Sequence, residues 1–203
     1  KKLGAGAAGL SLAGTFPAAA ASLLNTPKYS SLDYTWVSDH NGTDDELRER
    51  LERIKKAGLN GILPSGNYEK WIQLAEEFEL DVHAWFVTLQ RGGDQWLIEN
   101  HPEWFMVNRL GESSVDKPAY VDYYKWLCPV RPEAQQYIFN KVDEILKISE
   151  IKSVHRDYIR YPDVILPIQL QPTYGIVQDK EYPQYDYCYC DACRTKFKEL
   201  HGE

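Results

Sequence analysis

One short stretch of the chain spaces ionisable and aromatic side chains in a way that can support chemistry. It runs from Ser153 to Pro162 and reads SVHRDYIRYP. Side chains alternate along a strand, so His155 and Asp157 would share one face while Arg156 points to the other. Pro162 has no N–H to donate and is expected to end the strand. An aspartate at the end of a barrel strand can act as a nucleophile or stabilise positive charge, as cleavage of a sugar acetal requires.

Asp157 is therefore the predicted catalytic residue. Arg160 follows shortly after it and is expected to keep the carboxylate ionised, which suits a nucleophile better than an acid. Glycoside hydrolysis normally needs a second carboxylate, about 5–5.5 Å away for retention and farther for inversion. Asp39 and Asp163 are weak candidates, so we expect the general acid beyond the last residue of this chain. The alternative interpretation is that Asp157 only pairs with Arg160 or His155.

Other side chains near the expected strand ends are candidates for binding a sugar. The sequence holds six Trp and fourteen Tyr, and most of these rings are expected in the core. Rings near strand ends can instead lie against the apolar face of a pyranose. For His83, a buried structural role is an equally good interpretation. The predicted substrate-binding residues are Trp36, His83, Trp85, His155, Tyr158, Arg160 and Tyr161, with His40 and Asn67 as further loop residues.

The cysteines form a second constellation. Cys188, Cys190 and Cys193 are clustered in the sequence, and Cys128 is the fourth cysteine of the chain. A set of four thiols is typical of a structural zinc site, which here would hold the long loop after the catalytic strand. In an exported protein the alternative is disulfide bonds, for example between Cys128 and one of the other three. Catalysis itself is expected to require no cofactor.

The elements that must position these residues alternate between strands and helices. Thr43 and Glu46 have the spacing of a capping box, and Gly58 is placed to terminate the first helix. The segments 88–132 and 163–189 are expected to be long loops. Strands are expected at residues 34–37, 60–63, 82–87 and 153–162, and helices at residues 44–56, 68–78, 132–148 and 191–200.

This order predicts an α/β fold with a parallel sheet covered by helices. The segment 38–42 after the first strand is not a glycine-rich phosphate loop, which argues against a dinucleotide-binding doubly wound sheet. We therefore expect the first half of a (β/α)8 TIM barrel, about four βα units, with long loops after strands 3 and 4.

The two ends of the chain suggest export and truncation. Residues 1–22 combine a basic start, a short apolar run and small residues, as in an export signal of the Sec or Tat type. Residues 23–203 would then form the N-terminal half of the barrel, in the periplasm or outside the cell, without a stable membrane span after signal cleavage. Because the chain starts at Lys1 and stops just after a helix begins, we expect a piece of a longer protein that is inactive alone.

Charge limits the partners. The net charge is −7 and no basic stripe interrupts the acidic balance, so nucleic acid is not an expected partner. The expected partner is a polysaccharide or oligosaccharide.

The stretch 153–162 is similar to the HLDYIRYP signature of a glycosyl-hydrolase-like family often called family 10 glycosylhydrolases. Arg156 stands where that family usually has an apolar residue. The resemblance covers about residues 33–200 and implies an exported bacterial (β/α)8 barrel that hydrolyses O-glycosidic bonds. Its substrate would be peptidoglycan glycan or another bacterial or environmental polysaccharide. Further segments that resemble the family are residues 44–62, 82–86, 101–104 and 127–133.

Two other functions compete with hydrolysis of a glycan. The first is a carbohydrate-binding barrel that uses the aromatic loops without a complete acid and base pair. The second is a metal-dependent hydrolase such as a deacetylase, for which His83, His155 and Asp157 would have to be ligands.

Overall fold

The computed structural model describes residues 33–37 and 42–202 of the chain. The predicted export segment and the candidates Asp39 and His40 lie outside the described residues. In the part of the chain that is described, no helix is both long and apolar enough to cross a membrane.

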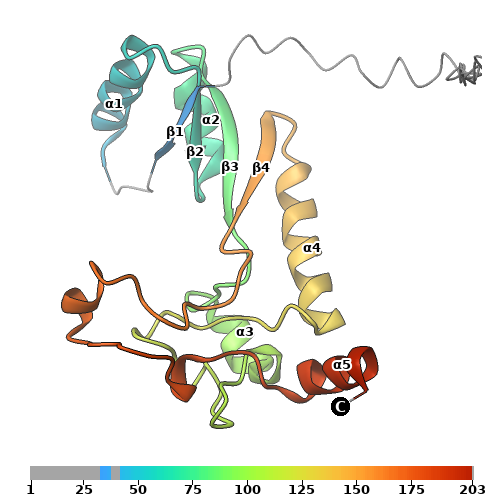
Figure 1. Cartoon of the computed structure of the whole chain (residues 1–203). Helices are drawn as coiled ribbons and strands as arrows, with labels where there is room; N and C mark the ends of the chain where they lie inside the picture. The colour runs from blue at the N-terminus through green and yellow to red at the C-terminus, as the bar shows by residue number, and fades with distance from the viewer. Residues whose placement is uncertain (1–32, 38–41, 203) are drawn as a thin grey trace, which may run out of the picture. The chain divides into compact units, whose positions relative to one another are not determined.

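The described residues contain a parallel four-stranded sheet (Figure 1). Its strands are β1 (Tyr34–Val37), β2 (Gly61–Pro64), β3 (Asp81–Val87) and β4 (Ile151–Asp157). They lie in the order β1-β2-β3-β4, so each strand pairs with the next one along the chain. A doubly wound sheet would reverse direction at a switch point, whereas successive barrel strands do not. The predicted α/β class is confirmed, and the strand order is that of consecutive barrel units.

The first helix forms where the capping signals predict it. In α1 (Asp44–Lys56), Thr43 Oγ1 accepts a hydrogen bond from the Glu46 N–H at 3.3 Å, and the Glu46 carboxylate accepts one from the Thr43 N–H at 2.7 Å. Gly58 follows with φ +85°, a left-handed conformation that glycine adopts without steric cost. The capping box and the terminating glycine are both confirmed.

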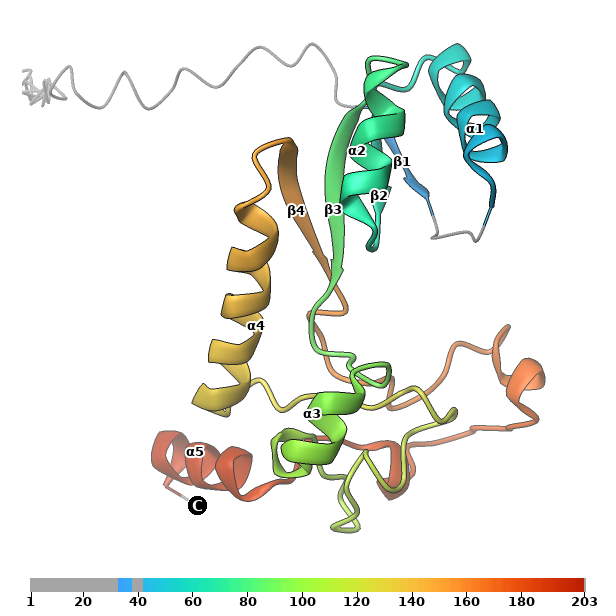
Figure 2. The same ribbon diagram turned by 180° about the vertical axis from the view of Figure 1, so that it is seen from behind.

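Helices cover one face of the sheet. Figure 2 shows α2 (Tyr68–Glu76) in front of β2 and β3. Side chains from α1, α2 and alternate strand positions form one apolar core, which we call the sheet core. It includes Leu51, Trp71, Ile62, Val82 and Ala84. Such alternation is what a strand with one helix-covered face requires.

A second core lies beyond the carboxyl ends of β3 and β4, and we call it the loop core. It joins Phe86 of β3 to residues of the long segment that follows, including Phe105, Trp126 and Leu127. Ile138 of α4 (Pro132–Leu146) also belongs to it. The helical spacing of apolar residues in 132–148 predicts Leu146 on the buried face of α4. Leu146 is 56% exposed, so that prediction is wrong.

The segment after β3 is more regular than the sequence indicated. It contains the short helix α3 (Gln95–Asn100), capped by the Asp94 carboxylate, and the 3₁₀ turn η3 (Pro102–Trp104). Both are shorter than the window over which helical periodicity can be recognised. The sequence of residues 107–112 predicts a small hairpin that turns at Leu110 and Gly111. This turn is present, with Asn108 Oδ1 accepting hydrogen bonds from the N–H groups of Leu110 and Glu112.

β4 ends earlier than the sequence indicated. Its last residue is Asp157, and Tyr158 adopts a left-handed backbone with φ +51°. The expectation that Pro162 ends the strand is wrong, because β4 already ends at Asp157, before the left-handed turn at Tyr158. The remaining elements are η4 (Gln171–Tyr174), η5 (Pro183–Tyr185) and α5 (Asp191–His201).

Gly61 is a close-packing position in the sheet. A Cβ atom there would lie 3.2 Å from the His83 ring and 3.3 Å from the Asp81 carbonyl oxygen. We expect Gly61→Ala to lower the free energy of unfolding by about 1–3 kcal/mol, as overpacking does. Gly66→Ala is the matched control, since nothing lies within 4 Å of its added Cβ. Thermal unfolding followed by circular dichroism would measure both, and equal melting temperatures for the two variants would contradict the close contact.

Candidate functional site

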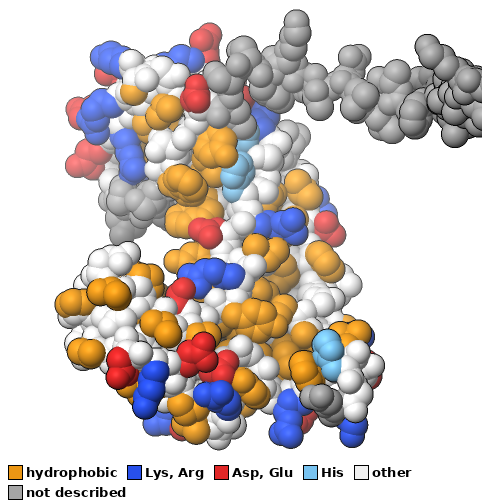
Figure 3. Space-filling view, in the orientation of Figure 1, with side chains coloured by type: hydrophobic (Ala, Val, Ile, Leu, Met, Phe, Trp, Pro, Cys, Tyr) orange, Lys and Arg blue, Asp and Glu red, His pale blue; other side chains and the backbone are white. Residues whose placement is uncertain are grey.

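The strand register places Trp85, His155 and Asp157 on one face of the sheet, opposite to the face that α2 covers (Figure 2). Trp85 lies opposite His155 in the β3–β4 pair, and Val87 lies opposite Asp157. Residues paired in register on parallel strands point to the same face, while Ala84 belongs to the sheet core on the other face. Figure 3 shows the side opposite to α2, where hydrophobic side chains gather with acidic, basic and histidine side chains among them.

Asp157 is exposed and held in place by two hydrogen bonds. Trp85 Nε1 donates to Asp157 Oδ2 at 3.0 Å, and the Tyr158 N–H donates to Oδ1 at 2.6 Å. The Asp157 carbonyl oxygen also accepts a bond from the Thr88 N–H at 2.8 Å, which continues the pairing one residue beyond the end of β3. The carboxylate therefore has a defined orientation at the carboxyl end of β4 and remains open to solvent.

Arg160 has a different partner from the one expected. Its Nη1 lies 3.2 Å from Asp163 Oδ2, and its Nη2 donates to the Tyr124 hydroxyl at 3.3 Å. The guanidinium also lies 5.3 Å from the centre of the Trp126 ring. The expected pairing of Arg160 with Asp157 is wrong, because the turn at Tyr158 directs Arg160 towards the loop core. Among the ion pairs of the described residues, none involves Asp157.

His83 has the environment of a buried structural histidine. It is 3% exposed, and its Nδ1 lies 2.8 Å from Ser153 Oγ, while Nε2 is buried without a hydrogen-bond partner. Burial lowers the pKa of His83 from its ordinary value. His155 packs edge-on against Tyr34 with ring centres 4.8 Å apart.

His83, His155 and Asp157 do not form the metal site that a deacetylase would need. Among the described residues, the group whose ligand atoms are close enough to share an ion consists of the four cysteines.

Two long loops meet beside Asp157. The Tyr120 hydroxyl donates to the Asp163 carbonyl oxygen at 2.6 Å, and the Tyr124 hydroxyl donates to the Asp163 carboxylate at 2.9 Å. Gln178 Oε1 accepts from the Leu166 N–H at 2.7 Å, which holds the later part of the second loop. Burial is the main cause that raises the pKa of Tyr120 to about 12. The loop after β4 is thus attached to the loop before α4 through two half-buried tyrosines.

Several of these loop residues were missed by sequence reasoning. Tyr120, Tyr124 and Trp126 line the base of the second loop, with Trp126 fully buried and its ring 5.6 Å from that of Tyr158. The one sequence feature that pointed to them was the abundance of aromatic residues between the third strand and the following helix. That signal indicates packing but does not say which ring meets which.

The remaining candidates lie in different surroundings. Trp36 is 57% exposed on β1, and Asn67 precedes α2 in a left-handed conformation. Tyr161 lines a hollow together with Cys188, Cys193 and residues of α5. Tyr161 therefore lies beside the cysteines.

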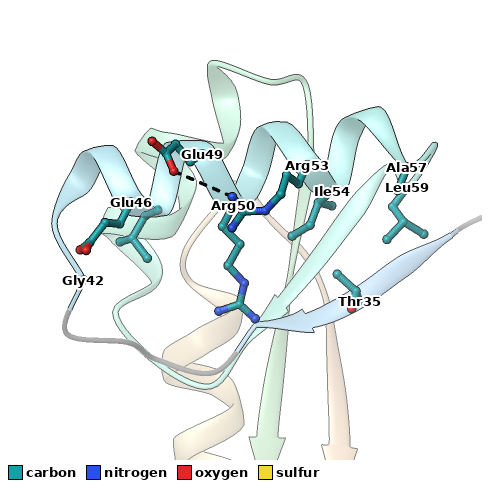
Figure 4. Close-up of a pocket in the computed structure, with 10 residues that line it drawn as sticks. Thr35, Gly42, Glu46, Glu49, Arg50, Arg53, Ile54, Ala57 and Leu59 are labelled. Atoms are coloured by element: carbon teal, nitrogen blue, oxygen red, sulfur yellow. Dashed lines mark ion pairs between the residues drawn. The ribbon is translucent and has the colours of Figure 1, made fainter.

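A separate hollow lies between α1 and β1 (Figure 4). Thr35 and Leu59 form one side of it, and Glu49 and Arg53 of α1, which are 3.9 Å apart as an ion pair, lie on the other. None of the predicted site residues lines this hollow. It is formed where α1 packs on the edge strand and has no part in the candidate site.

A family comparison identifies the chain. The family model described as glycosyl hydrolase-like 10 matches residues 63–178, which is more than half of the sequence. The chain belongs to the glycosyl hydrolase-like 10 family. The resemblance read from residues 153–162 is thereby confirmed. No curated protein matches the sequence.

Several solved structures of glycosidases are similar to this chain. The catalytic domain of a β-amylase from Paenibacillus polymyxa is 12% identical with a TM-score of 0.49, and the match covers 85% of this chain and 49% of that one. A maltogenic α-amylase from Thermotoga neapolitana is 14% identical with a TM-score of 0.47, covering 70% and 42%. An α-galactosidase from Geobacillus stearothermophilus is 13% identical with a TM-score of 0.46, covering 71% and 24%. The chain spans less than half the length of each.

The buried histidine predicts a pH dependence of stability. Burial lowers the pKa of His83, so the unfolded chain binds a proton at this histidine more readily than the folded chain does. The stability contributed by neutral His83 should be fully present above about pH 6.5 and should fall as the pH drops below that value. We expect His83→Asn, whose amide can still bond Ser153, to lose less stability than the original chain on acidification. Urea unfolding at several pH values would measure this.

His201→Gln is the control for that experiment, since His201 is exposed at the end of α5. It should keep the pH dependence of the unmodified protein. The same acid-induced loss in His83→Asn as in the unmodified protein would show that His83 is not its source.

Proposed function

We propose that this chain is the catalytic half-barrel of an exported glycoside hydrolase that cleaves O-glycosidic bonds in a polysaccharide. The observation that supports the proposal is the position of Asp157, exposed at the carboxyl end of β4 on the helix-free face. Catalytic groups of barrel enzymes occupy that end of the strands. Membership of a glycosyl hydrolase-like family agrees with this chemistry.

In this proposal Asp157 faces the anomeric carbon. Two donors, Trp85 Nε1 and the Tyr158 N–H, hold its oxygens, so the carboxylate needs little reorientation when positive charge develops on the sugar ring. It acts either as the nucleophile of a retaining mechanism or as the stabiliser of an oxocarbenium-like transition state. The general acid is a second carboxylate outside the described residues, because Asp163 is already engaged by Arg160 and Tyr124. No cofactor takes part in this chemistry.

The proposed substrate is peptidoglycan glycan or another bacterial or environmental glycan. Trp36 offers an exposed ring on the same sheet, and Tyr158 and Arg160 lie just beyond Asp157. A pyranose has an apolar face that packs on such rings, and its hydroxyl groups can bond Arg160. Export by a Sec or Tat signal would place the protein where such polymers are found.

A carbohydrate-binding role without catalysis is the second candidate. It is favoured by one observation, which is that the carboxylate nearest in sequence after Asp157, Asp163, is committed to an ion pair with Arg160. If no other carboxylate reaches the sugar, the helix-free face can bind a glycan and cannot cleave it. The two candidates differ in their response to loss of the Asp157 charge.

Replacing Asp157 by asparagine tests the catalytic role. In the intact protein, assayed on peptidoglycan and other bacterial glycans, we expect Asp157→Asn to lower kcat at least about 10²–10³-fold, as loss of one group that stabilises transition-state charge does. Binding of the glycan should persist. Asp81→Asn is the matched control, because Asp81 begins β3 at the opposite end of the sheet. Unchanged turnover in Asp157→Asn would refute the assignment.

Trp36 provides a test of glycan binding. Trp36→Ala should raise the Kd for a soluble glycan fragment about tenfold, since an exposed ring that stacks on a ligand contributes on the order of 1.4 kcal/mol. Trp96→Ala is a close control, because Trp96 is 54% exposed but lies on α3. Calorimetric titration would compare them. Equal affinities for the two variants would remove Trp36 from the binding surface.

A further inference from the structure

The sulfur atoms of Cys128, Cys188, Cys190 and Cys193 form a compact cluster. All four lie within 4.8 Å of one another. Cys128 Sγ is 3.4 Å from Cys193 Sγ and 3.5 Å from Cys190 Sγ. The cluster is built by segments far apart in the sequence, because Cys128 precedes α4 while the other three surround the start of α5. Cys128 and Cys190 are buried and the other two are half-buried.

These distances correspond to four ligands around one ion. Zn–S bonds of about 2.3 Å in a tetrahedron place neighbouring sulfurs about 3.8 Å apart, close to the separations observed. A disulfide would bring two of the sulfurs to about 2.05 Å and leave the other two outside the bond. Here Cys128 is almost equally far from two partners, and all four cysteines are free thiols.

We propose that these four cysteines bind one Zn²⁺ ion as a structural site. Four protein thiolates fill a tetrahedral zinc site and leave no position for water or substrate, so the ion has no catalytic role. Tetrahedral S₄ sets suit zinc or iron, and hard-cation sites made of oxygen ligands are excluded by the donor atoms. The inference is independent of the proposed glycosidase activity.

The position of the site indicates what the zinc stabilises. Cys128 follows the loop-core residues Trp126 and Leu127, and its N–H donates to the Trp104 carbonyl oxygen at 2.8 Å. Tyr189, between two ligands, donates its N–H to Val107 at 2.7 Å. The ion thus joins the starts of α4 and α5 to the loop after β3. The ion would fix the end of the second long loop, residues 163–189. The start of this loop lies shortly after Asp157 and the turn at Tyr158.

Tyr161 connects this site with the sequence signature. It lines a hollow with Cys188 and Cys193, three residues beyond Tyr158. The end of the signature therefore rests against the cysteine cluster. Loss of the ion is expected to loosen residues 163–189 while α1, α2 and the sheet core remain folded.

Metal analysis of the purified chain tests the proposal. We expect one zinc per chain, and a mercurial reagent should release it in step with the loss of thiols. A zinc-free protein with four reactive thiols would overturn the proposal, as would two disulfides detected by mass spectrometry. Iron in place of zinc would overturn the identity of the ion. These measurements use the unmodified chain, so they do not depend on the folding of any variant.

A pair of variants localises the ion. Cys193→Ser should lower zinc affinity at least about tenfold, since even changes around a ligand have that effect. Tyr189→Phe is the control, because it changes the same turn, removes the hydroxyl that donates to Asp186, and keeps all four thiols. Limited proteolysis should then cut residues 163–189 faster in Cys193→Ser than in Tyr189→Phe. Equal zinc content and equal cleavage would contradict the site.

Discussion

The pairing of β3 with β4 is the contact on which the rest of the described structure depends. The two strands are separated by the whole segment that contains α3 and α4, yet their register places Val87 opposite Asp157. The pairing continues past both strands, because Thr88 and Leu89 donate to the carbonyl oxygens of Asp157 and Tyr158. Since parallel strands end at one edge, this register brings both long loops to the same place. It also sets the face on which Asp157 lies.

The signature stretch, residues 153–162, has two structural roles, and the change from one to the other comes at Asp157. Residues before the turn belong to the sheet, where Val154 packs against both cores and His155 lies on the helix-free face. Residues after it belong to the loops, where Tyr158 and Arg160 pack near the buried Trp126. A glycosidase barrel needs a rigid strand to hold the carboxylate and an irregular loop to shape the substrate. The proposed zinc site would anchor the far end of that loop.

Features that depend on residues close together in the sequence could be predicted. The α1 capping box, the glycine after it and the four strands follow from short-range rules, and the structure has them close to the expected residues. The errors have physical causes. α3 is too short to show a period, and Leu146 follows the helical stripe but is exposed at the end of α4. The pairing of Arg160 with Asp157 was expected from their closeness in the sequence, whereas the turn at Tyr158 sends the guanidinium to Asp163.

The sequence alone determined the α/β class, the family and the identities of the residues able to do chemistry, because each depends on local pattern and residue type. It indicated a common role for the four cysteines without showing that they meet. Only the tertiary structure decided which of these residues lie together, since contacts such as Trp85 with Asp157, or Cys128 with Cys193, join segments far apart in the chain. Those contacts are set by strand register and core packing, and neither can be read from any single segment.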